Sequence, residues 1–354
     1  MRPLDSLPRL LLYVLRACYQ AVAKAFRRIA WLDYFASYLR QPGRVLAVWP
    51  NAGVPLGPDV ALFVHYDRRG EVRPHVLHYV TALNAAGLSV LFVTNAEKLT
   101  DAAWAALKPV CAGILVRGNI GYDFGAMREG LAHFGLPRAN TTRVIIVNDS
   151  VYGPFRPLDG ILARIDLDQA DVWGLTESWQ TRYHLQSFFV AVGRRAMENP
   201  AWREFWNDVR PVKSKTWVVD QYEVGLTQAL LRGGLRCRAL WPYPDLVTRV
   251  DGYALMEVSE EFPVSREPII EMRNIHAHRI RYSAVSRRPL NPTSDLWRQL
   301  LETEFPFIKR ELLRDNPGAV TDISDWRLVI ARLYGPIPEM IEQDLQRVMR
   351  DRAP

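Results

Sequence analysis

Short apolar runs alternate with helix-like segments through the middle of the sequence, and this alternation restricts the fold more than any other feature. Uninterrupted apolar runs predict buried strands at residues 60–66, 88–94, 113–116 and 144–147. Helical patterns between them predict helices at residues 74–86, 100–107 and 126–134. Strands that alternate with helices of this length form right-handed βαβ units. We therefore expect an α/β fold, a Rossmann-like, mostly parallel sheet with helices on both faces.

The fourth strand ends abruptly in the polar residues Asn148, Asp149 and Ser150, which a Gly-Pro turn follows. In open α/β sheets ligands lie at the carboxyl ends of the strands, because the loops there surround a crevice that the helices do not fill. The same residues could simply end the strand, since such turns are common. The stretch thus predicts either a ligand site or a polar strand terminator.

A glycine-rich loop follows the third strand at the same edge of the predicted sheet. Its glycines let the backbone approach a ligand, and Arg117 and Arg128 are suited to phosphate oxygens. A helix that begins near Phe124 would add the positive end of its dipole; alternatively, Asp123 only caps that helix. Neither a Gly-x-Gly-x-x-Gly motif after the first strand nor a P-loop sequence occurs, so neither a dinucleotide site nor a P-loop is supported.

Most of the formal net charge of +7 lies in residues 1–44, which hold eight Lys and Arg against two Asp. Apolar residues from Leu11 to Ile29 recur at helical spacing opposite the cations, which predicts a basic amphipathic helix in an arm of residues 1–41. Its charges exclude a membrane span. Residues 9–40 could lie on the anionic inner face of the cell membrane, with Trp31, Tyr34 and Tyr38 at headgroup depth, or the helix could pack on its own domain. Because the cations are confined to this helix, we expect no nucleic acid partner.

Turn residues at 42–58 predict a linker, which leaves residues 59–285 as the main domain and 286–354 as a helical segment that packs on it. Helices are predicted at 296–303, 307–313, 326–334 and 340–348, and we expect no chemistry from them. The three cysteines are far apart and fit a reducing compartment. We therefore expect a cytoplasmic protein.

Five short motifs follow one another between residues 119 and 227. They are Asn119-x-Gly121-x-Asp123-Phe124-Gly125, Asn148-Asp149-Ser150-Val151-Tyr152-Gly153-Pro154, Gly174-Leu175-Thr176-x-Ser178, His184-Leu185-Gln186-Ser187-Phe188-Phe189 and Glu223-x-Gly225-Leu226-Thr227. In order and spacing, the chain from about residue 60 to 320 resembles the rhamnan synthesis F family of bacterial polysaccharide glycosyltransferases. The resemblance implies a GT-A-like fold and the transfer of a sugar from a nucleotide donor to a growing cell-surface or lipid-linked glycan. The donor that it implies first is dTDP-L-rhamnose, which carries L-rhamnose.

The resemblance also assigns residues to a nucleotide-sugar donor site at the ends of the strands. The donor residues expected there are His65, Tyr66, Asp67, Asn95, Arg117, Asn119, Gly121, Tyr122, Asp123, Phe124, Gly125, Arg128, Asn148, Asp149 and Ser150. GT-A enzymes typically hold a divalent metal with Asp-x-Asp, but here one carboxylate is missing. Asp149 and His276 could hold Mg²⁺ or Mn²⁺ if His276 and His278 share one face of a strand, although a surface histidine is the commoner case. Without a metal, Arg117, Arg128 and the helix terminus would have to neutralise the diphosphate.

Transfer with inversion needs a carboxylate that takes the proton of the acceptor hydroxyl. Glu223, at the start of a helix predicted to run to about Leu231, is the leading candidate, with Asp220, Glu177 and Asp149 as rivals; His184 could orient the acceptor or act as the base. Glu223 could instead only complement the helix dipole. Acceptor contacts are expected from Thr176, Ser178, Trp179, Tyr183 and Gln186. A non-catalytic module that binds a nucleotide sugar or a polysaccharide remains the alternative to an enzyme.

Overall fold

The computed structural model describes residues 30–51, 53–249, 275–283, 288–336 and 338–352. Its central sheet has the strand order β1-β4-β3-β2-β5-β9-β7-β10, and β8 pairs with β7. The strands are β1 Val45–Trp49, β2 Asp59–His65, β3 Ser89–Thr94, β4 Gly113–Arg117, β5 Arg143–Asn148, β7 Val172–Ser178, β8 His184–Leu185, β9 Phe189–Gly193 and β10 Cys237–Trp241. β4, β3, β2 and β5 run parallel to one another, as do β7 and β10. β9 lies between β5 and β7 and is antiparallel to both, so β5 and β7 point the same way. All six strands of this sheet other than β1, β8 and β9 therefore share one direction.

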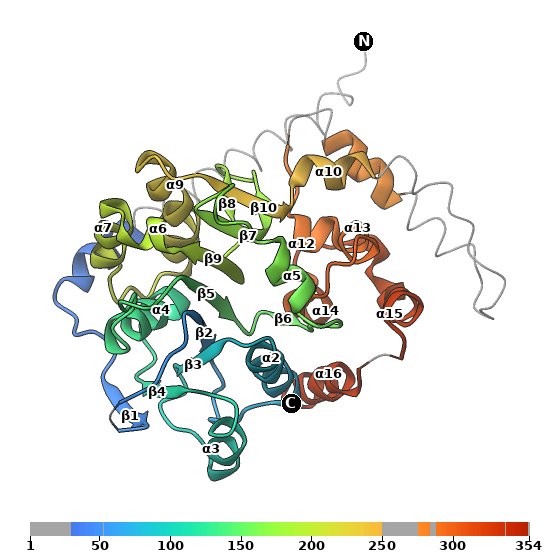
Figure 1. The fold of residues 1–354 in the computed structure, drawn as a ribbon. Helices are drawn as coiled ribbons and strands as arrows, with labels where there is room; N and C mark the ends of the chain where they lie inside the picture. The colour runs from blue at the N-terminus through green and yellow to red at the C-terminus, as the bar shows by residue number, and fades with distance from the viewer. Residues whose placement is uncertain (1–29, 52, 250–274, 284–287, 337, 353–354) are drawn as a thin grey trace, which may run out of the picture.

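Helices cover both faces of the sheet because each central strand buries side chains on both sides. On one face, Ala61 and Phe63 of β2 pack against α2 and α3; on the other, Leu62 and Val64 pack against α4. Figure 1 shows α4, α7 and α9 on one side of the sheet and α2, α5 and α13 on the other. The helices are α2 Pro74–Ala85, α3 Asp101–Leu107, α4 Tyr122–His133, α5 Asp159–Arg164, α6 Arg194–Glu198, α7 Pro200–Asp208, α8 Lys215–Trp217, α9 Val224–Arg232 and α10 Tyr243–Thr248. The predicted α/β fold is confirmed.

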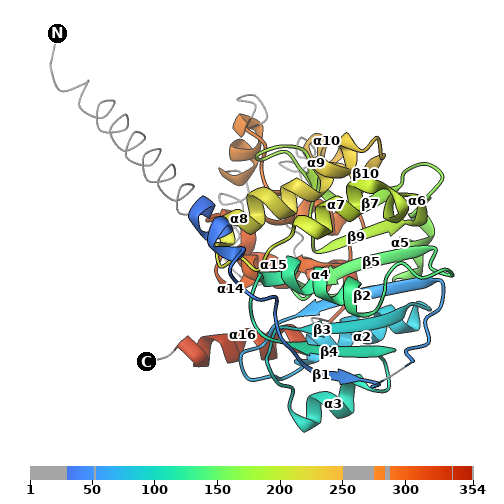
Figure 2. The same ribbon diagram turned by 90° about the vertical axis from the view of Figure 1, so that its left-hand side faces the viewer.

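The C-terminal part of the chain forms a third apolar cluster around Trp297, Trp326 and Ile330, which joins the main body through Tyr152. Its elements are α12 Pro292–Asp295, α13 Trp297–Glu302, β11 Ile308–Lys309, α14 Arg310–Arg314, α15 Trp326–Tyr334 and α16 Glu339–Arg352. β11 pairs with β6 (Val151–Tyr152), directly after β5. Figure 2 shows α8, α14 and α16 gathered at one edge of the sheet. The C-terminal segment therefore meets the sheet where β5 ends.

Three elements differ from the sequence-based expectations. The predicted linker 42–58 contains β1, which pairs with β4 as the edge strand of the sheet. The apolar run at residues 185–192 predicts a single strand, which the structure divides into β8 and β9. The helix predicted at 307–313 begins only at Arg310, because Ile308 and Lys309 pair with β6.

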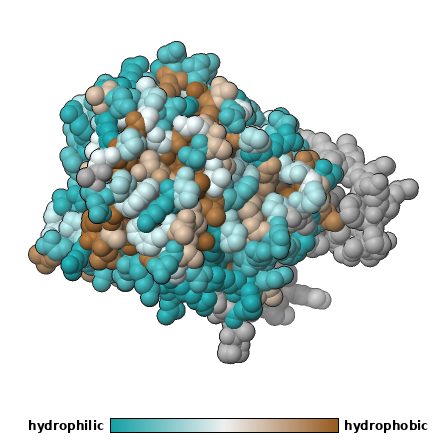
Figure 3. Space-filling view, turned by 60° about the horizontal axis from the view of Figure 1, so that its bottom comes forward, coloured by the Kyte–Doolittle hydropathy of each residue, from teal (hydrophilic) through white to brown (hydrophobic). Residues whose placement is uncertain are grey.

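The predicted amphipathic helix at residues 11–29 lies outside the described residues, but residues 30–37 are helical. Tyr34 of this helix stacks on Trp217 with ring centroids 4.4 Å apart. No helix within the described ranges is both long and apolar enough to cross a membrane. On the face shown in Figure 3, hydrophobic residues occur as patches among hydrophilic ones.

Candidate active site

The carboxyl ends of the parallel strands bring their terminal polar residues to one edge of the sheet. Val64 of β2 is in register with Asn148 of β5, and His65 is in register with Thr94 of β3. His65 is buried, and its Nδ1 lies 3.0 Å from Thr94 Oγ1. The strand ends therefore form a continuous polar edge, as the sequence predicted.

Two adjoining cavities open at this edge. The larger, which we call the basic cavity, has a volume of about 510 Å³ and is lined by His65, Tyr66, Asp67, Arg68, Arg73, Asp149, Arg310 and Arg314, among others. The smaller, which we call the Glu223 cavity, has a volume of about 210 Å³ and is lined by Tyr122, Phe124, Asn148, Gln186, Ser187, Phe188 and Glu223, among others. Asp123, Ser150, Lys215 and Lys309 line both. These four residues mark the junction of the two cavities.

Ten of the residues expected in the donor and acceptor sites line one of these cavities. They are His65, Tyr66, Asp67, Asp123, Asp149 and Ser150 in the basic cavity, and Tyr122, Phe124, Asn148 and Gln186, again with Asp123 and Ser150, in the Glu223 cavity. The Gln186 amide is fixed by three polar side chains, since its Oε1 accepts from Thr176 and its Nε2 donates to Asn291 and Thr293. Thr176 therefore supports a cavity residue without lining either cavity.

Arg117 differs most from its expected role as a phosphate ligand. Its side chain is fully buried, and its guanidinium donates to Glu129 at 2.5 Å, to the Ile120 carbonyl at 2.8 Å and to Asn95 Oδ1. If the Arg117 guanidinium turned toward a ligand, the buried groups that it now binds would lose their partner, which is costly. Arg117 and Asn95 therefore hold the loop after β4 in place.

The glycines of that loop also act through packing. Gly121 precedes α4 with a φ of 82°, in the left-handed region that favours glycine. A Cβ atom on Gly125 would lie 2.8 Å from the Ile120 carbonyl oxygen. Asn119, Gly121 and Gly125 line neither cavity, and Arg128 lines a separate one beside Trp202. The loop thus positions Tyr122 and Asp123 at the start of α4.

Asp149 is held by an arginine from the C-terminal segment. Arg310 Nη1 donates to Asp149 Oδ2 at 3.1 Å and to its carbonyl oxygen at 2.7 Å, while Nη2 lies 3.2 Å from Asp344 Oδ2 on α16. The pairing of β11 with β6 places Arg310, whose amide donates to the Ser150 carbonyl at 2.9 Å. We expected no chemistry from this segment, but its residues Lys309 and Arg310 line the basic cavity.

His276 lies away from Asp149, so the structure does not form the expected metal pair. His276 is on a helix of residues 275–283 rather than a strand, is buried, and its Nε2 lies 2.6 Å from the Asp295 carbonyl oxygen. It lines neither cavity. Within the described parts of the chain, no three His, Cys, Asp or Glu side chains are placed to hold a metal ion. The Asp149 carboxylate instead has a cationic partner, Arg310.

A second carboxylate, Asp123, lies near Asp149 at the cavity junction. Asn148 Nδ2 donates to Asp123 Oδ2 at 3.1 Å. Burial, together with the negative charges of Asp149 and Glu223, raises the pKa of Asp123 to about 7. At neutral pH this side chain therefore changes its charge with small shifts of its surroundings.

Replacing Asp123 by asparagine is expected to stabilise the protein at pH 8. Because its folded pKa is above the unfolded value, the folded state binds more protons between about pH 4 and 7, so wild-type stability falls as the pH rises through that window. The variant lacks this loss. Its free energy of unfolding should therefore exceed that of the wild type by on the order of 2 kcal/mol at pH 8 and equal it near pH 4. Urea denaturation at several pH values measures the difference. A variant less stable than wild type at pH 8 contradicts the assignment.

Glu223 is fixed at the other side of the junction. It ends a π-helical turn, Val218–Glu223, that leads into α9, and its Oε1 accepts hydrogen bonds from the amide and the Oγ of Ser187 at 3.2 and 3.0 Å. π-Helical turns often occur at functional sites. Ser187 therefore orients the carboxylate into the cavity that both residues line. In the sequence, only the place of Ser187 beside Gln186 in the motif of residues 184–189 pointed to this role of Ser187.

The other proposed acceptor and catalytic residues lie outside the two cavities. Asp220 lines a different cavity with Trp31 and Trp217, and His184 Nδ1 lies 2.8 Å from the Arg182 carbonyl. Trp179 is half-exposed and packs on Tyr183, with ring centroids 4.9 Å apart. Ser178 and Glu177 are buried at the end of β7. Among the described residues, Glu223 and Asp123 therefore remain as carboxylates that line the Glu223 cavity without an ion-pair partner.

The sequence is similar to known proteins over more than half of its length. The family described as rhamnan synthesis protein F matches residues 90–284. The virulence protein VirA of Vibrio anguillarum is 32% identical over 217 residues, which cover 60% of this chain and 66% of that protein. The uncharacterized protein y4gN of Sinorhizobium fredii is 26% identical over 54% of this chain and 51% of that protein. The chain thus spans slightly less than two thirds of the length of the first of these relatives and about half of the other.

Two solved structures show weaker similarity. A mannosyltransferase from Pyrobaculum calidifontis, in complex with GDP-Man and Mn²⁺, has a TM-score of 0.33 and 13% identity, with 95% of this chain and 92% of that chain covered. The galactosyltransferase LgtC, in complex with donor and acceptor sugar analogs, has a TM-score of 0.28 and 15% identity, with 50% and 73% covered. Scores this low carry no conclusion about the chain.

Proposed function

Because this chain belongs to the rhamnan synthesis protein F family, we propose that it is a glycosyltransferase that moves a sugar from a nucleotide donor to a glycan acceptor. The observation that supports this most is the pair of cavities that meet at Asp123, Ser150, Lys215 and Lys309. One cavity is rich in cations and suits a diphosphate, and the other holds a fixed carboxylate. A transferase needs both surfaces in contact at the reacting carbon.

In the proposed reaction the nucleotide diphosphate occupies the basic cavity and the acceptor hydroxyl lies in the Glu223 cavity. The acceptor oxygen bonds to the anomeric carbon from the face opposite the phosphate, which inverts the configuration. The bond from that carbon to the phosphate oxygen breaks, and its electron pair leaves with the nucleoside diphosphate. Glu223 takes the hydroxyl proton, while Ser187 holds the carboxylate in position.

For the finer identity of the substrates, we propose L-rhamnose carried by dTDP as the donor sugar, and a growing cell-surface polysaccharide or lipid-linked glycan as the acceptor. The family description, rhamnan synthesis, supports this choice. The test is incubation of the full chain with dTDP-L-rhamnose, UDP-glucose or GDP-mannose and candidate glycans, with released nucleotide and extended glycan both measured. Glycan extension from dTDP-L-rhamnose supports the proposal, and extension from UDP-glucose or GDP-mannose alone contradicts the choice of donor. Donor binding without release on any acceptor supports a non-catalytic binding module instead.

We also propose that residues 30–39 contact the cytoplasmic face of the membrane, next to the acceptor. Leu32, Phe35 and Leu39 are 68%, 60% and 91% exposed and recur at helical spacing, while the other side of this segment packs on Trp217. An apolar helical stripe beside the basic residues of the preceding arm suits the interface of an anionic membrane.

Replacing Leu32, Phe35 and Leu39 together by glutamine is expected to weaken binding to phosphatidylglycerol vesicles at least about tenfold, since each apolar side chain loses its transfer free energy. Vesicle flotation measures the bound fraction. Met349→Gln, at a residue 73% exposed on α16, is the control and should bind as the wild type does. Equal flotation of all three proteins argues against this surface.

A further inference from the structure

We propose that Lys215 and Lys309 at the cavity junction, together with Arg310 of the basic cavity, hold the donor diphosphate in place of a divalent metal ion. This inference rests on the proposed transferase function and adds how its donor is bound. It follows from where the cations lie and from what already occupies Asp149.

Two lysines lie at the cavity junction. Lys215 at the start of α8 and Lys309 on β11 line both cavities, so they lie where a sugar–phosphate bond would pass from one cavity to the other. Among the described residues, none forms an ion pair with Lys215, and Lys309 has only a loose contact with Glu311, at 3.8 Å. Both lysines can therefore turn to an anion without losing a close partner.

Asp149 already has a cationic partner. Arg310 Nη1 donates to both the carboxylate and the carbonyl oxygen of that residue, and Arg310 Nη2 donates to the Asp344 carboxylate. A hard cation such as Mg²⁺ or Mn²⁺ needs several oxygen ligands, and here the carboxylate at the end of β5 already has a cationic partner. Asp149 thus positions a fixed positive charge at the place where the sequence resemblance predicted a metal ligand.

Negative charge develops on the diphosphate during the proposed reaction. As the bond to the anomeric carbon breaks, the leaving diphosphate gains negative charge at the junction. Fixed cations stabilise such charge most when they are held in place before the reaction. Arg310 is held at three points, and its side chain is only 14% exposed. The lysines supply the flexible donors that complete the phosphate contacts.

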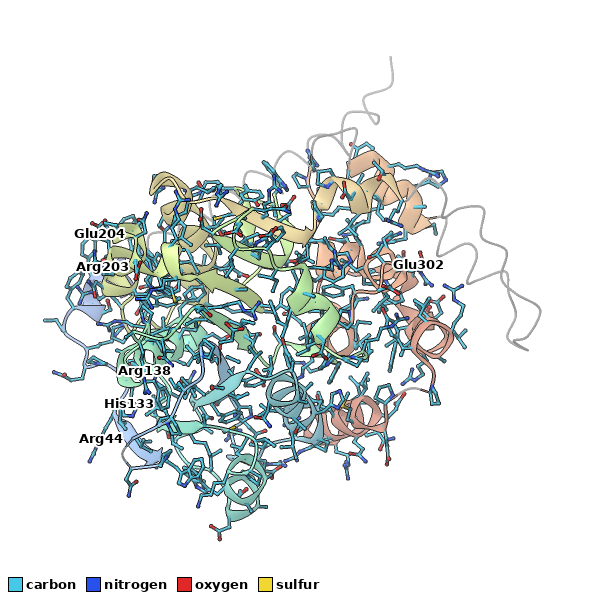
Figure 4. All side chains as sticks on the ribbon, in the orientation of Figure 1. Arg44, His133, Arg138, Arg203, Glu204 and Glu302 are labelled. Carbon is cyan, nitrogen blue, oxygen red and sulfur yellow. The ribbon has the colours of Figure 1, made fainter. Side chains whose placement is uncertain are left out.

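Isothermal titration of the full chain with UDP, GDP and dTDP, in buffer with EDTA and in buffer with Mn²⁺, tests the inference. We expect the preferred nucleotide to bind with a dissociation constant that differs less than about threefold between the buffers. The double variant Lys215→Gln/Lys309→Gln should bind at least about tenfold more weakly in both, the scale of a lost charge-assisted hydrogen bond. Arg203→Gln is the matched control and should bind as the wild type does, because Arg203, which Figure 4 labels, lines a separate cavity beside Trp202.

The outcomes separate this inference from the proposed function. Binding that requires Mn²⁺ overturns the inference and leaves the transferase proposal intact. Unchanged affinity in the double variant also overturns it. Absence of nucleotide binding in both buffers overturns the proposed function, and this inference with it.

Discussion

Replacing Glu223 by glutamine is expected to lower sugar transfer at least about a hundredfold while nucleotide binding stays within about threefold of the wild type. Glutamine has nearly the same shape and can still accept a hydrogen bond from Ser187, which the wild-type carboxylate receives at 3.0 Å. It cannot take a proton from the acceptor hydroxyl. Because the residue lines the Glu223 cavity and not the basic cavity, the donor should be bound almost as before.

The matched control for this variant is Asp220→Asn, one helical turn earlier. Asp220 lines a separate cavity beside Trp31, so transfer should stay near the wild-type rate. Turnover with each variant and titration with the nucleotide, measured on the same preparations, distinguish loss of chemistry from loss of binding. Near-normal turnover in Glu223→Gln would remove the residue from the role of base.

If Glu223 is not the base, Asp123 is the next candidate. It lies at the junction of both cavities, and its pKa of about 7 suits proton transfer near neutral pH. In Glu223→Gln one of the charges that raise the pKa of Asp123 is gone, so its pKa should lie below 7. A rate that rises with pH below about pH 7 in Glu223→Gln, and loses this rise in the double variant with Asp123→Asn, would assign the proton transfer to Asp123.

The parts of the fold that depend on local patterns could be predicted closely. β2, α2, β3 and α3 begin and end within two residues of the expected positions, and Thr100 Oγ1 accepts from the Ala103 amide as a cap. A strand buried on both faces and a capped amphipathic helix can be predicted because both depend on residues that are close together in the sequence. β1 was missed because its five residues lie among turn residues, and only pairing with the distant β4 makes them a strand.

The site divides in the same way. Asn148, Asp149 and Ser150 end a strand that the sequence marks clearly, and the structure places them at a cavity edge. Arg310, 161 residues from Asp149, could not be matched to it from spacing, because the contact depends on how β11 pairs with β6. The sequence also could not show the partner of Arg117. Its place in a glycine-rich loop suggested phosphate binding, but its guanidinium donates to Glu129 on α4. Composition identifies a cation, while tertiary structure decides its partner.

Replacing Asp344 by asparagine is expected to destabilise the protein by about 3 kcal/mol at pH 7, the scale for breaking one partner of a buried ion pair. The Asp344 side chain is 1% exposed, and its oxygens contact Arg73 at 2.5 Å, Arg310 at 3.2 Å and the Tyr152 hydroxyl at 2.6 Å. The variant leaves two arginines without their shared carboxylate. Arg310 should then hold Asp149 less firmly, so nucleotide binding should weaken as well.

The pH dependence of this loss follows from the charge of Asp344. Although burial raises it, Arg310 and the neighbouring cations hold the pKa of Asp344 well below its usual range. A carboxylate with a lowered folded pKa stabilises the protein above its unfolded pKa of about 4, and this stability is lost as the pH falls further. The difference in unfolding free energy between wild type and Asp344→Asn should therefore be constant from about pH 5 to 8 and shrink below about pH 4.

Urea denaturation of both proteins from pH 3 to 8 measures this difference, and Glu342→Gln on the same helix is the control. Glu342 pairs with Arg327 at the surface, 2.6 Å apart, and such exposed pairs contribute less than about 1 kcal/mol. A difference for Asp344→Asn as small as that of the control, or one that grows as the pH falls, would show that α16 does not hold Arg310 through this carboxylate. A large difference that fades in acid, together with weaker nucleotide binding, would make the C-terminal helix a structural part of the donor site.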